Sequence, residues 1–267
     1  MRVITYHVVR DLYQFEKQLQ YLKGNGYTFL TLSEFLSKLA AAKGFRSSDI
    51  LITFDDGDYS VYEKGMPLLK KHGIPAVLFV ITELINKDKP FWWDEILYYT
   101  DDYNKVRWAK TIGNEERLNY LETLRKDTTK ARLQQRQLTT EELREMERSG
   151  IAIANHTETH PMLDKVTDSE LQSELSASAN FLKANGFEHY NVLAYPNGNI
   201  SDIVVKKMEV NGYRAGFLFN HRLMNSTDNP YRISRLSMND YTPLWKYKLI
   251  LSGLHSKLLS VKRKALG

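Results

Sequence analysis

The stretch Ile50-Leu51-Ile52-Thr53-Phe54-Asp55-Asp56-Gly57 decides the fold of this chain. Residues 50–54 form a compact run of apolar and β-branched side chains, which is typical of a strand buried in a sheet. Asp55, Asp56 and Gly57 suit turn geometry and end the strand. The sequence therefore predicts a buried strand that carries two adjacent carboxylates at its carboxyl end.

On both sides of this stretch, β-like runs alternate with amphipathic helical patterns. The β-like runs cover residues 3–9, 50–54, 76–81, 151–154, 192–194, 213–219 and 231–238. Helix starts are marked by Asp11, by Ser201 and by the pairs Thr31–Glu34, Thr139–Glu142 and Thr167–Glu170. This alternation predicts an α/β fold with a parallel sheet, and about seven strands in about 240 residues favour a closed or nearly closed barrel. A doubly wound open sheet is the alternative, but the sequence has no glycine-rich phosphate turn to support it.

Residues 82–138 break this rhythm and predict a helical insertion between two strands of the barrel. They contain a cluster of aromatic side chains, namely Phe91, Trp92, Trp93, Tyr98, Tyr99, Tyr103 and Trp108. We expect one domain over residues 1–240 with this insertion inside it, followed by a basic helix over residues 241–267. The aromatic cluster has two interpretations: it packs the insertion on the barrel, or Trp93 and its neighbours form the wall of a sugar-binding subsite.

Composition narrows the chemistry. The chain has 267 residues, no cysteine and a formal net charge of +5. Without thiolates, any metal ion must be held by imidazole and carboxylate groups. Residues 245–267 include six basic residues and no acidic one, which leaves 31 basic against 32 acidic residues in the rest of the chain. The body of the protein is therefore nearly neutral, which argues against nucleic acid as a partner.

The C-terminal segment has two interpretations that stay open. Leu249, Ile250, Leu254, Leu258 and Leu259 share a helical stretch with lysines, as in helices that lie peripherally on anionic membranes. The same pattern suits a terminal helix that closes the barrel. The N-terminus lacks the apolar stretch of a signal peptide, and no run reaches the roughly 18 apolar residues of a membrane span. We therefore expect a protein of the cytoplasm or of the inner face of the membrane, unless a leader has been trimmed.

Polar side chains directly follow four of the predicted strands. These side chains are Asp55 with Asp56, His156, Tyr195 with Pro196, and His7. In parallel βα folds the carboxyl ends of the strands meet on one face, where functional groups gather. The sequence therefore predicts a single site that these residues share.

A metal site is the chemistry that this set of residues favours. His156 and His160 are four residues apart, a spacing that lets both imidazoles bind one ion. Of two adjacent carboxylates, one can bind a metal while the other acts as a general base. Asp56 with the two histidines would leave positions open for water and substrate. We expect one divalent ion, zinc first, with Co, Ni, Fe or Mn as alternatives. Taken singly, the Asp pair is also a common turn and the histidines also suit a surface loop.

Three segments in series resemble the motifs of the polysaccharide deacetylases, the NodB-homology group of carbohydrate esterase family 4. They are residues 53–57 (Thr-Phe-Asp-Asp-Gly), 156–161 (His-Thr-x-x-His-Pro) and 194–198 (Ala-Tyr-Pro-x-Gly). Residues 6–9 and 231–235 resemble the subgroup of biofilm poly-N-acetylglucosamine deacetylases. The resemblance covers about residues 2–240.

The resemblance implies a distorted (β/α)7 barrel and a hydrolase of non-peptide carbon–nitrogen bonds that removes N-acetyl groups from an amino-sugar glycan. It implies that Asp55 is the general base and that the metal ligands are Asp56, His156 and His160. It also implies that the backbone N–H of Tyr195 helps to hold the oxyanion. The usual late Leu-x-x-His motif is not evident, and His7 on the first strand is the candidate for the general acid.

The third motif lacks its frequent arginine. Arg235 is a candidate to orient Asp55 instead, and it is also a candidate for substrate binding, together with Tyr195, Pro196 and Trp93. Three other functions stay open: an O-acetyl esterase, a deacetylase of a lipid-linked or nucleotide-linked sugar, and an inactive glycan-binding homologue. Amide and ester hydrolysis pass through similar oxyanions, so the motifs do not separate the first two from N-deacetylation.

Overall fold

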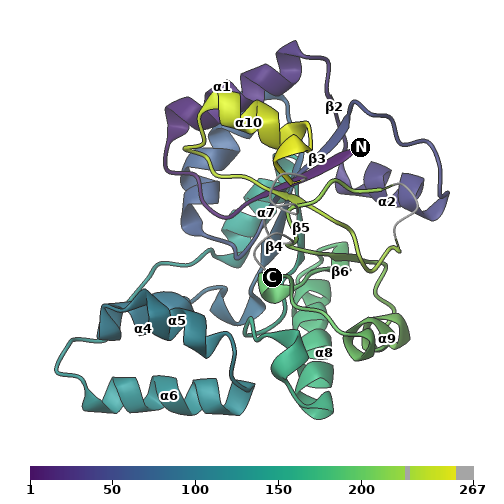
Figure 1. Cartoon of the computed structure of the whole chain (residues 1–267). Coiled ribbons are helices and arrows are strands. Elements are labelled where there is room, and N and C mark those ends of the chain that lie inside the picture. The colour runs from purple at the N-terminus through teal and green to yellow at the C-terminus, as the bar shows by residue number, and fades with distance from the viewer. Residues whose placement is uncertain (226–228, 257–267) are drawn as a thin grey trace, which may run out of the picture.

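The computed structural model describes residues 1–225 and 229–256, and a parallel sheet lies at its centre (Figure 1). Its strands are β1 (Arg2–Tyr6), β3 (Asp49–Phe54), β4 (Ala76–Val80), β5 (Ile151–Asn155), β6 (His189–Ala194), β7 (Ala215–Phe217) and β8 (Leu236–Ser237). They are ordered β7-β6-β5-β4-β3-β1-β8, with the short β2 (Thr28–Phe29) paired to β3. Every strand pair is parallel, as the alternation of strands and helices predicted.

The sheet curls until its two edges approach each other. Phe217 at the end of β7 forms a parallel bridge with Ile233, and three residues later Leu236 pairs with Ile4 of β1. The segment between β7 and β8 therefore links the two edges, and the predicted α/β barrel of distorted type is confirmed. The last two β-like runs were predicted too long, because only three residues of β7 and two of β8 form strand ladders.

Strand β3 shows why the deciding stretch is continuously apolar. Ile50, Ile52 and Phe54 pack in the cluster formed with the helices outside the sheet, whereas Leu51 packs inside the barrel with Val77. All six residues of β3 are buried. Because successive side chains of a strand point to opposite faces, a strand covered on both faces is mostly apolar, and the two polar residues of β3, Asp49 and Thr53, are hydrogen-bonded.

Helices surround the sheet, and five of them begin at the caps that the sequence predicted. They are α1 (Leu12–Gly24), α2 (Leu32–Ala40), the π-helix η1 (Val61–Gly65), α3 (Met66–His72), α7 (Thr140–Arg148), α8 (Asp168–Ala184) and α9 (Asp202–Val210). The side chains of Asp11 and Ser201 cap α1 and α9. All three predicted capping boxes form, before α2, α7 and α8.

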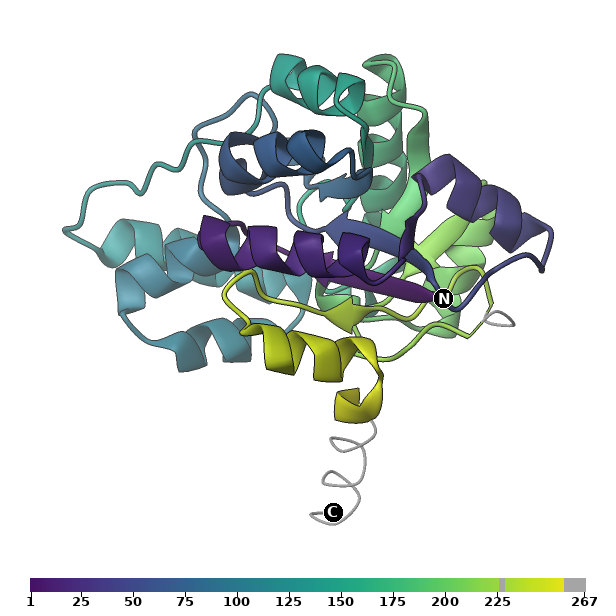
Figure 2. The ribbon, with the colours of Figure 1, turned by 90° about the horizontal axis from the view of Figure 1, so that it is seen from above.

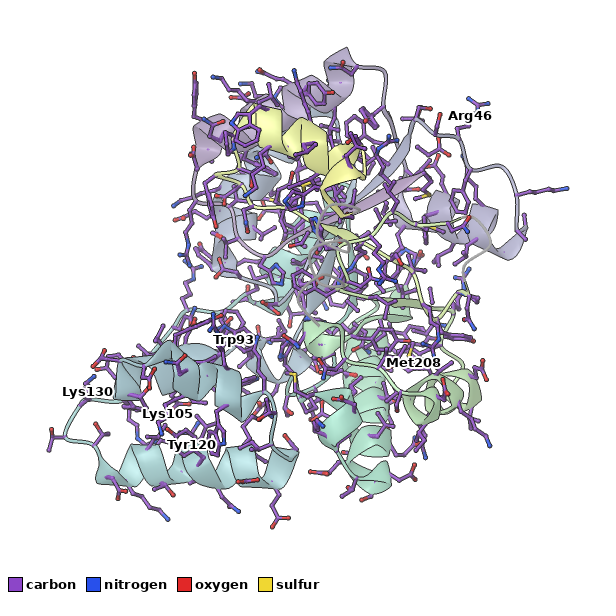
Figure 3. The ribbon with its side chains drawn as sticks, in the orientation of Figure 1. Arg46, Trp93, Lys105, Tyr120, Lys130 and Met208 are labelled. Atoms are coloured by element: carbon purple, nitrogen blue, oxygen red, sulfur yellow. The ribbon has the colours of Figure 1, made fainter. Side chains whose placement is uncertain are left out.

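Between β4 and β5 the chain leaves the barrel and forms the 310 turn η2 (Thr82–Leu84) and the helices α4 (Trp92–Thr100), α5 (Tyr103–Ala109) and α6 (Asn114–Asp127). These three helices project from one end of the barrel (Figure 1). Their hydrophobic cluster includes Trp92, Ile96, Val106 and Leu121, together with Met162 from the loop after β5. Figure 3 shows Trp93 at the edge of these helices that meets the barrel. The domain boundaries at 1–240 and 82–138 stay predictions.

The C-terminal helix α10 (Leu244–Leu251) lies beside α1 (Figure 2). Its side chains Tyr247, Ile250 and Leu251 are buried, and the Tyr247 ring lies 6.4 Å from that of Tyr21. This part of the tail therefore packs on the barrel. Leu258 and Leu259 lie outside the described residues, so peripheral membrane contact stays a hypothesis. In the part of the chain that the structure describes, no helix is long and apolar enough to cross a membrane.

Two glycine substitutions test the packing of the barrel. A Cβ at Gly216 would lie 2.2 Å from the hydroxyl oxygen of Tyr195, which is held by a hydrogen bond to the carbonyl of Tyr231. We expect Gly216→Ala to lower the free energy of unfolding by about 1–3 kcal/mol. Gly24→Ala, at the end of α1 with no atom within 4 Å, should be neutral or stabilising by up to about 1 kcal/mol. Urea unfolding of both variants measures the difference, and equal stability would contradict the packing described.

Candidate active site

The predicted strand-end residues meet at one pocket of about 190 Å³. Those that line it are His7 after β1, Asp55 and Asp56 after β3, and His156 and His160 after β5. Asp56 has a left-handed backbone with φ of 70°, followed by Gly57 at 82°. This tight turn places two successive carboxylates at the mouth of the barrel, since a regular strand would point them to opposite faces.

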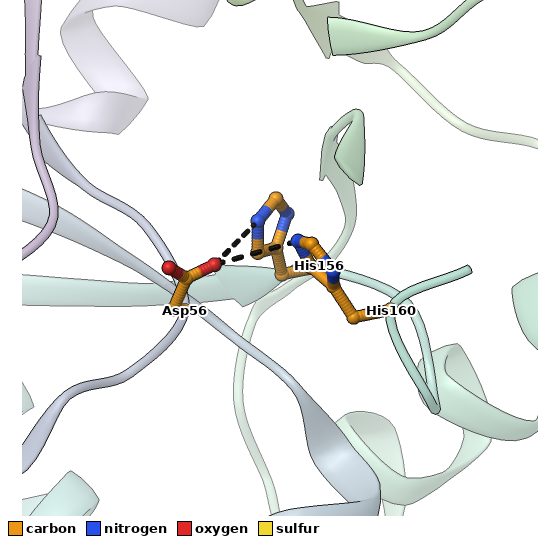
Figure 4. A group of neighbouring side chains, drawn as sticks. All are labelled: Asp56, His156 and His160. Atoms are coloured by element: carbon orange, nitrogen blue, oxygen red, sulfur yellow. Dashed lines mark ion pairs between the residues drawn. The ribbon is translucent and has the colours of Figure 1, made fainter. Parts of the chain in front are cut away.

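Asp56 and the two histidines converge on a common point (Figure 4). Asp56 Oδ1 lies 3.2 Å from His156 Nε2 and 3.4 Å from His160 Nε2. All three donor atoms lie within 4.8 Å of one another. Two ligands at 2.0–2.1 Å from a tetrahedral zinc ion would be about 3.4 Å apart. The donor set and its spacing therefore fit a divalent ion such as zinc.

The loop that carries the two histidines is held by its own side chains. Thr157 N donates to Asn155 Oδ1 at 2.7 Å, and His160 N donates to Thr157 Oγ1 at 3.0 Å. Thr157 and His160 have left-handed backbones with φ of 70° and 57°. Such conformations are costly for residues other than glycine. The loop therefore depends on these bonds to present both imidazoles to Asp56.

The two imidazoles differ in their surroundings. His156 Nδ1 donates to the carbonyl of Ala194 at 2.8 Å, which turns Nε2 toward Asp56. Burial opposes the charge on His156, but Asp56 and Asp55 outweigh it and raise its pKa. Burial and the neighbouring His156 lower the pKa of His160 well below its usual value. A neutral imidazole is the form that binds a metal, so both the orientation and the neutral His160 suit this role.

Asp55 is paired with a buried arginine. Nη1 and Nη2 of Arg235 each donate to one oxygen of Asp55 at 2.7 Å. The guanidinium also donates to Thr53 and to the carbonyl of Leu218, and Arg235 is 0% exposed. Burial alone would raise the pKa of Asp55, but the charge and hydrogen bonds of Arg235, together with the nearby His156 and His7, outweigh burial and lower the pKa. Asp55 is therefore ionised and oriented at neutral pH.

The structure contradicts the role predicted for the amide of Tyr195, whereas substrate binding by Pro196, Arg235 and Trp93 stays a prediction. The N–H of Tyr195 donates to the carbonyl of Phe217 at 3.0 Å, within the β6–β7 ladder, so it is not available to hold an oxyanion. The Tyr195 side chain is 0% exposed, and Pro196, buried at the start of the turn η4 (Pro196–Gly198), does not line the pocket. Arg235 meets Asp55, which is the orienting role considered for it. Trp93 does line the pocket.

Several pocket residues were missed by the sequence analysis. They are Val106 and Lys110 of the insertion, Asn197 and Phe219, whereas Tyr103, which also lines the pocket, belongs to the predicted aromatic cluster. Lys110 Nζ donates to Asn197 Oδ1 at 3.1 Å, which joins the insertion to the loop after β6. Burial lowers the pKa of Lys110. The sequence predicted an insertion at this position in the chain, but no motif marks which residues of the insertion face the pocket.

A second pocket of about 320 Å³ lies between the insertion and the barrel. Trp93 lines both pockets, and Phe91, Arg117 and Glu174 are among the other residues of the second one. The Trp93 ring stacks on Phe91 at 4.8 Å and lies 4.7 Å from the ring of His160. Trp93 therefore lies between the pocket that contains Asp56, His156 and His160 and the larger second pocket.

Most residues of this site lie in a region that the chain shares with a known protein family. The family model for polysaccharide deacetylase matches residues 42–216, which include the Asp pair and both histidines. The poly-beta-1,6-N-acetyl-D-glucosamine N-deacetylase of Staphylococcus aureus (strain MRSA252) is 27% identical over 237 residues, 85% of this chain and 67% of that protein. The protein YxkH of Bacillus subtilis (strain 168) is 27% identical over 203 residues, 76% of this chain. The aligned region spans only 56% of the length of YxkH.

Solved structures support the fold. The deacetylase PplD of Streptococcus pyogenes, in complex with acetate, has a TM-score of 0.70 at 19% identity, with 95% of this chain and 97% of that chain covered. IcaB from Ammonifex degensii has a TM-score of 0.67 at 20% identity, with 94% and 95% covered. The curled parallel sheet and its surrounding helices are therefore an arrangement that these proteins share.

The buried ion pair generates a stability prediction. Arg235→Met leaves Asp55 buried without a counter-charge, and we expect a loss of about 3–5 kcal/mol in the free energy of unfolding. Arg235→Met combined with Asp55→Asn removes both charges and should recover part of that loss. Urea unfolding in the presence of a chelator measures both. A double variant no more stable than the single one would contradict the pairing.

Proposed function

This chain belongs to the polysaccharide deacetylase family, and from that premise we propose that it is a metal-dependent N-deacetylase of a β-1,6-linked N-acetylglucosamine polymer. The observation that carries the proposal is the convergence of Asp56, His156 and His160 beside the ionised Asp55. The named activity of the Staphylococcus aureus relative supports the choice of polymer. Hydrolysis would convert an acetamide and water into acetate and a free amine.

Asp56, His156 and His160 would hold one divalent ion, for which zinc is our first choice and Co, Ni, Fe or Mn are alternatives. Such an ion, when bound, polarises a carbonyl oxygen and makes water more acidic. Ionisation of the carboxylate supports this assignment, because the neighbouring histidines outweigh the effect of burial and lower the pKa of Asp56.

Asp55 would act as the general base. Its two oxygens are oriented by Arg235, yet each carboxylate oxygen has a further lone pair that can accept a proton from water. The oxygen of that water forms the new bond to the acetyl carbon, and the carbon–nitrogen bond then breaks. Asp55 is ionised, lies next to Asp56 in the chain and is held by Arg235. It suits this role better than Asp56, whose Oδ1 faces the two histidines.

His7 would act as the general acid. It lines the pocket from the carboxyl end of β1, and its ring lies edge-on to Phe219 at 5.2 Å. A ring nitrogen of His7 would give its proton to the departing amine nitrogen, which balances the proton that Asp55 accepts. With the Tyr195 amide engaged in the sheet, the ammonium group of Lys110 is a donor in the pocket that suits the oxygens of the glycan.

The polymer would extend across Trp93. The pocket beyond this residue has about 320 Å³, within the roughly 300–1,000 Å³ typical of small-molecule sites. Its mixture of aromatic and charged side chains suits a sugar ring with hydroxyl groups. We propose that it takes a unit adjacent to the one that loses its acetyl group.

Variants of the two carboxylates should behave differently. His156→Ala and Asp56→Asn should lose bound metal and activity together, because each removes a ligand. Asp55→Asn should retain metal and lower turnover by about 10²–10⁴-fold, the usual contribution of a general base. Metal content and acetate release from β-1,6-linked N-acetylglucosamine oligomers, with added Zn, Co or Ni, measure the two effects. Wild-type turnover in metal-loaded Asp55→Asn would remove the assignment of the base.

The same assay tests the activity itself. Release of acetate from N-acetylated oligomers is expected, and faster release from O-acetylated sugars would instead identify an esterase. Tight binding of the oligomers without any release would identify a glycan-binding protein.

Chain-length dependence tests the second pocket. We expect Trp93→Ala to raise the KM for a hexamer about 2–10-fold more than the KM for a dimer, because one stacking contact is worth about 0.5–1.5 kcal/mol. Trp93 also touches His160, but a disturbance there would change both substrates alike. An unchanged ratio of the two KM values would contradict the extended binding path.

A further inference from the structure

We propose that the helical insertion is part of the metal site, because it fixes the ligand His160 through its backbone carbonyl. The inference rests on the proposed function only in taking Asp56, His156 and His160 as ligands. It assigns Trp92 at the start of α4 and Arg117 in α6 as positioning residues. Neither belongs to the three motifs in the barrel.

Two donors from the insertion meet on one oxygen. Trp92 Nε1 donates to the carbonyl of His160 at 3.1 Å, and Arg117 Nη1 donates to the same oxygen at 3.1 Å. The exposed fractions of Trp92, Arg117 and His160 are 8%, 3% and 6%. Water therefore has little access to these groups. The two hydrogen bonds compensate the carbonyl of His160 for the hydrogen bonds to water that it loses on burial.

His160 needs this support because of its place in the chain. Its φ of 57° is left-handed, and Pro161 follows it without an N–H group. Its N–H is held by Thr157 Oγ1, but its carbonyl has no part in the sheet. The insertion therefore binds the carbonyl of His160, whereas the N–H of His160 is bound by a side chain of its own loop.

The rings of the two histidines show the same asymmetry. His156 is oriented by a bond from Nδ1 to the carbonyl of Ala194, which is how metal-binding histidines are usually fixed. Within residues 1–225 and 229–256, Nδ1 of His160 has no hydrogen-bond partner. Its ring instead lies against the ring of Trp93, at 4.7 Å and 59°. His160 is therefore the ligand whose position depends on the insertion.

Arg117 is itself held firmly. Nη2 donates to Asn114 Oδ1 at 2.7 Å, and the guanidinium carbon lies 4.6 Å from the centre of the Trp92 ring. Asn114 in turn donates to Glu170 of α8 at 3.0 Å. These contacts connect the two donors to each other and to a helix of the barrel. A shift of the insertion would consequently move His160 relative to Asp56 and His156.

The experiment compares metal affinity in matched variants of the full chain. Trp92→Phe keeps the ring and removes the donor, Arg117→Met removes the charge and the donor, and the two are also combined. Arg125→Met is the control, since this arginine of α6 pairs with Glu95 and does not contact His160. Competition with a chromogenic chelator measures zinc affinity, the absorption spectrum of the cobalt-loaded protein reports ligand geometry, and metal-free thermal unfolding reports stability.

We expect the combined variant to bind zinc about 10–100-fold more weakly than the wild type, the usual cost of losing an outer partner of a metal ligand. Its cobalt spectrum should also change. Arg125→Met should bind zinc within about threefold of the wild type at comparable loss of thermal stability. Arg117→Lys, which retains a charged donor, should recover part of the affinity and remains informative if the combined variant does not fold.

Equal zinc affinity in the combined variant and in Arg125→Met would overturn the inference. A wild-type chain that binds no zinc or cobalt would overturn both the inference and the proposed function. If the wild type binds zinc, the combined variant loses affinity, and no acetylated glycan releases acetate, the inference stands and the proposed function fails.

Discussion

The buried pair of Asp55 and Arg235 is the constraint on which the rest of the site depends. Two carboxylates in sequence at the end of β3 repel each other, and Asp55 is buried while the side chain of Asp56 is 14% exposed. Arg235 neutralises Asp55 through two bonds of 2.7 Å, which leaves the charge of Asp56 to the two histidines. The adjacent residues can therefore play different parts, because each is paired with a different partner.

Much of this arrangement could be predicted from the sequence. Strand ends and caps are local properties, so the barrel and the meeting of His7, Asp55, Asp56, His156 and His160 follow from periodicity. The amide of Tyr195 was assigned wrongly, because its partner Phe217 is set by the pairing of β6 with β7. The contacts of Lys110, Trp92 and Arg117 depend on how an insertion packs, which no local pattern encodes.

The helical insertion adds contacts to the barrel at the end where the pockets lie. It supplies the wall residue Trp93 to two adjoining pockets, a charged group to the first of them, and two donors to the carbonyl of His160. The proposed support of His160 and the wall of both pockets thus arise from the same three helices. Under these proposals, substitutions made there to alter substrate preference would also act on the proposed metal ligands.

The partners of the buried ion pair are 180 residues apart in the chain. A fragment limited to residues 42–216 would contain all three proposed metal ligands and Asp55, but neither His7 nor Arg235. During synthesis, the ligands emerge from the ribosome well before the arginine that neutralises their neighbour. The carboxylate of Asp55 therefore cannot gain this counter-charge until the chain has been made as far as residue 235, just before β8.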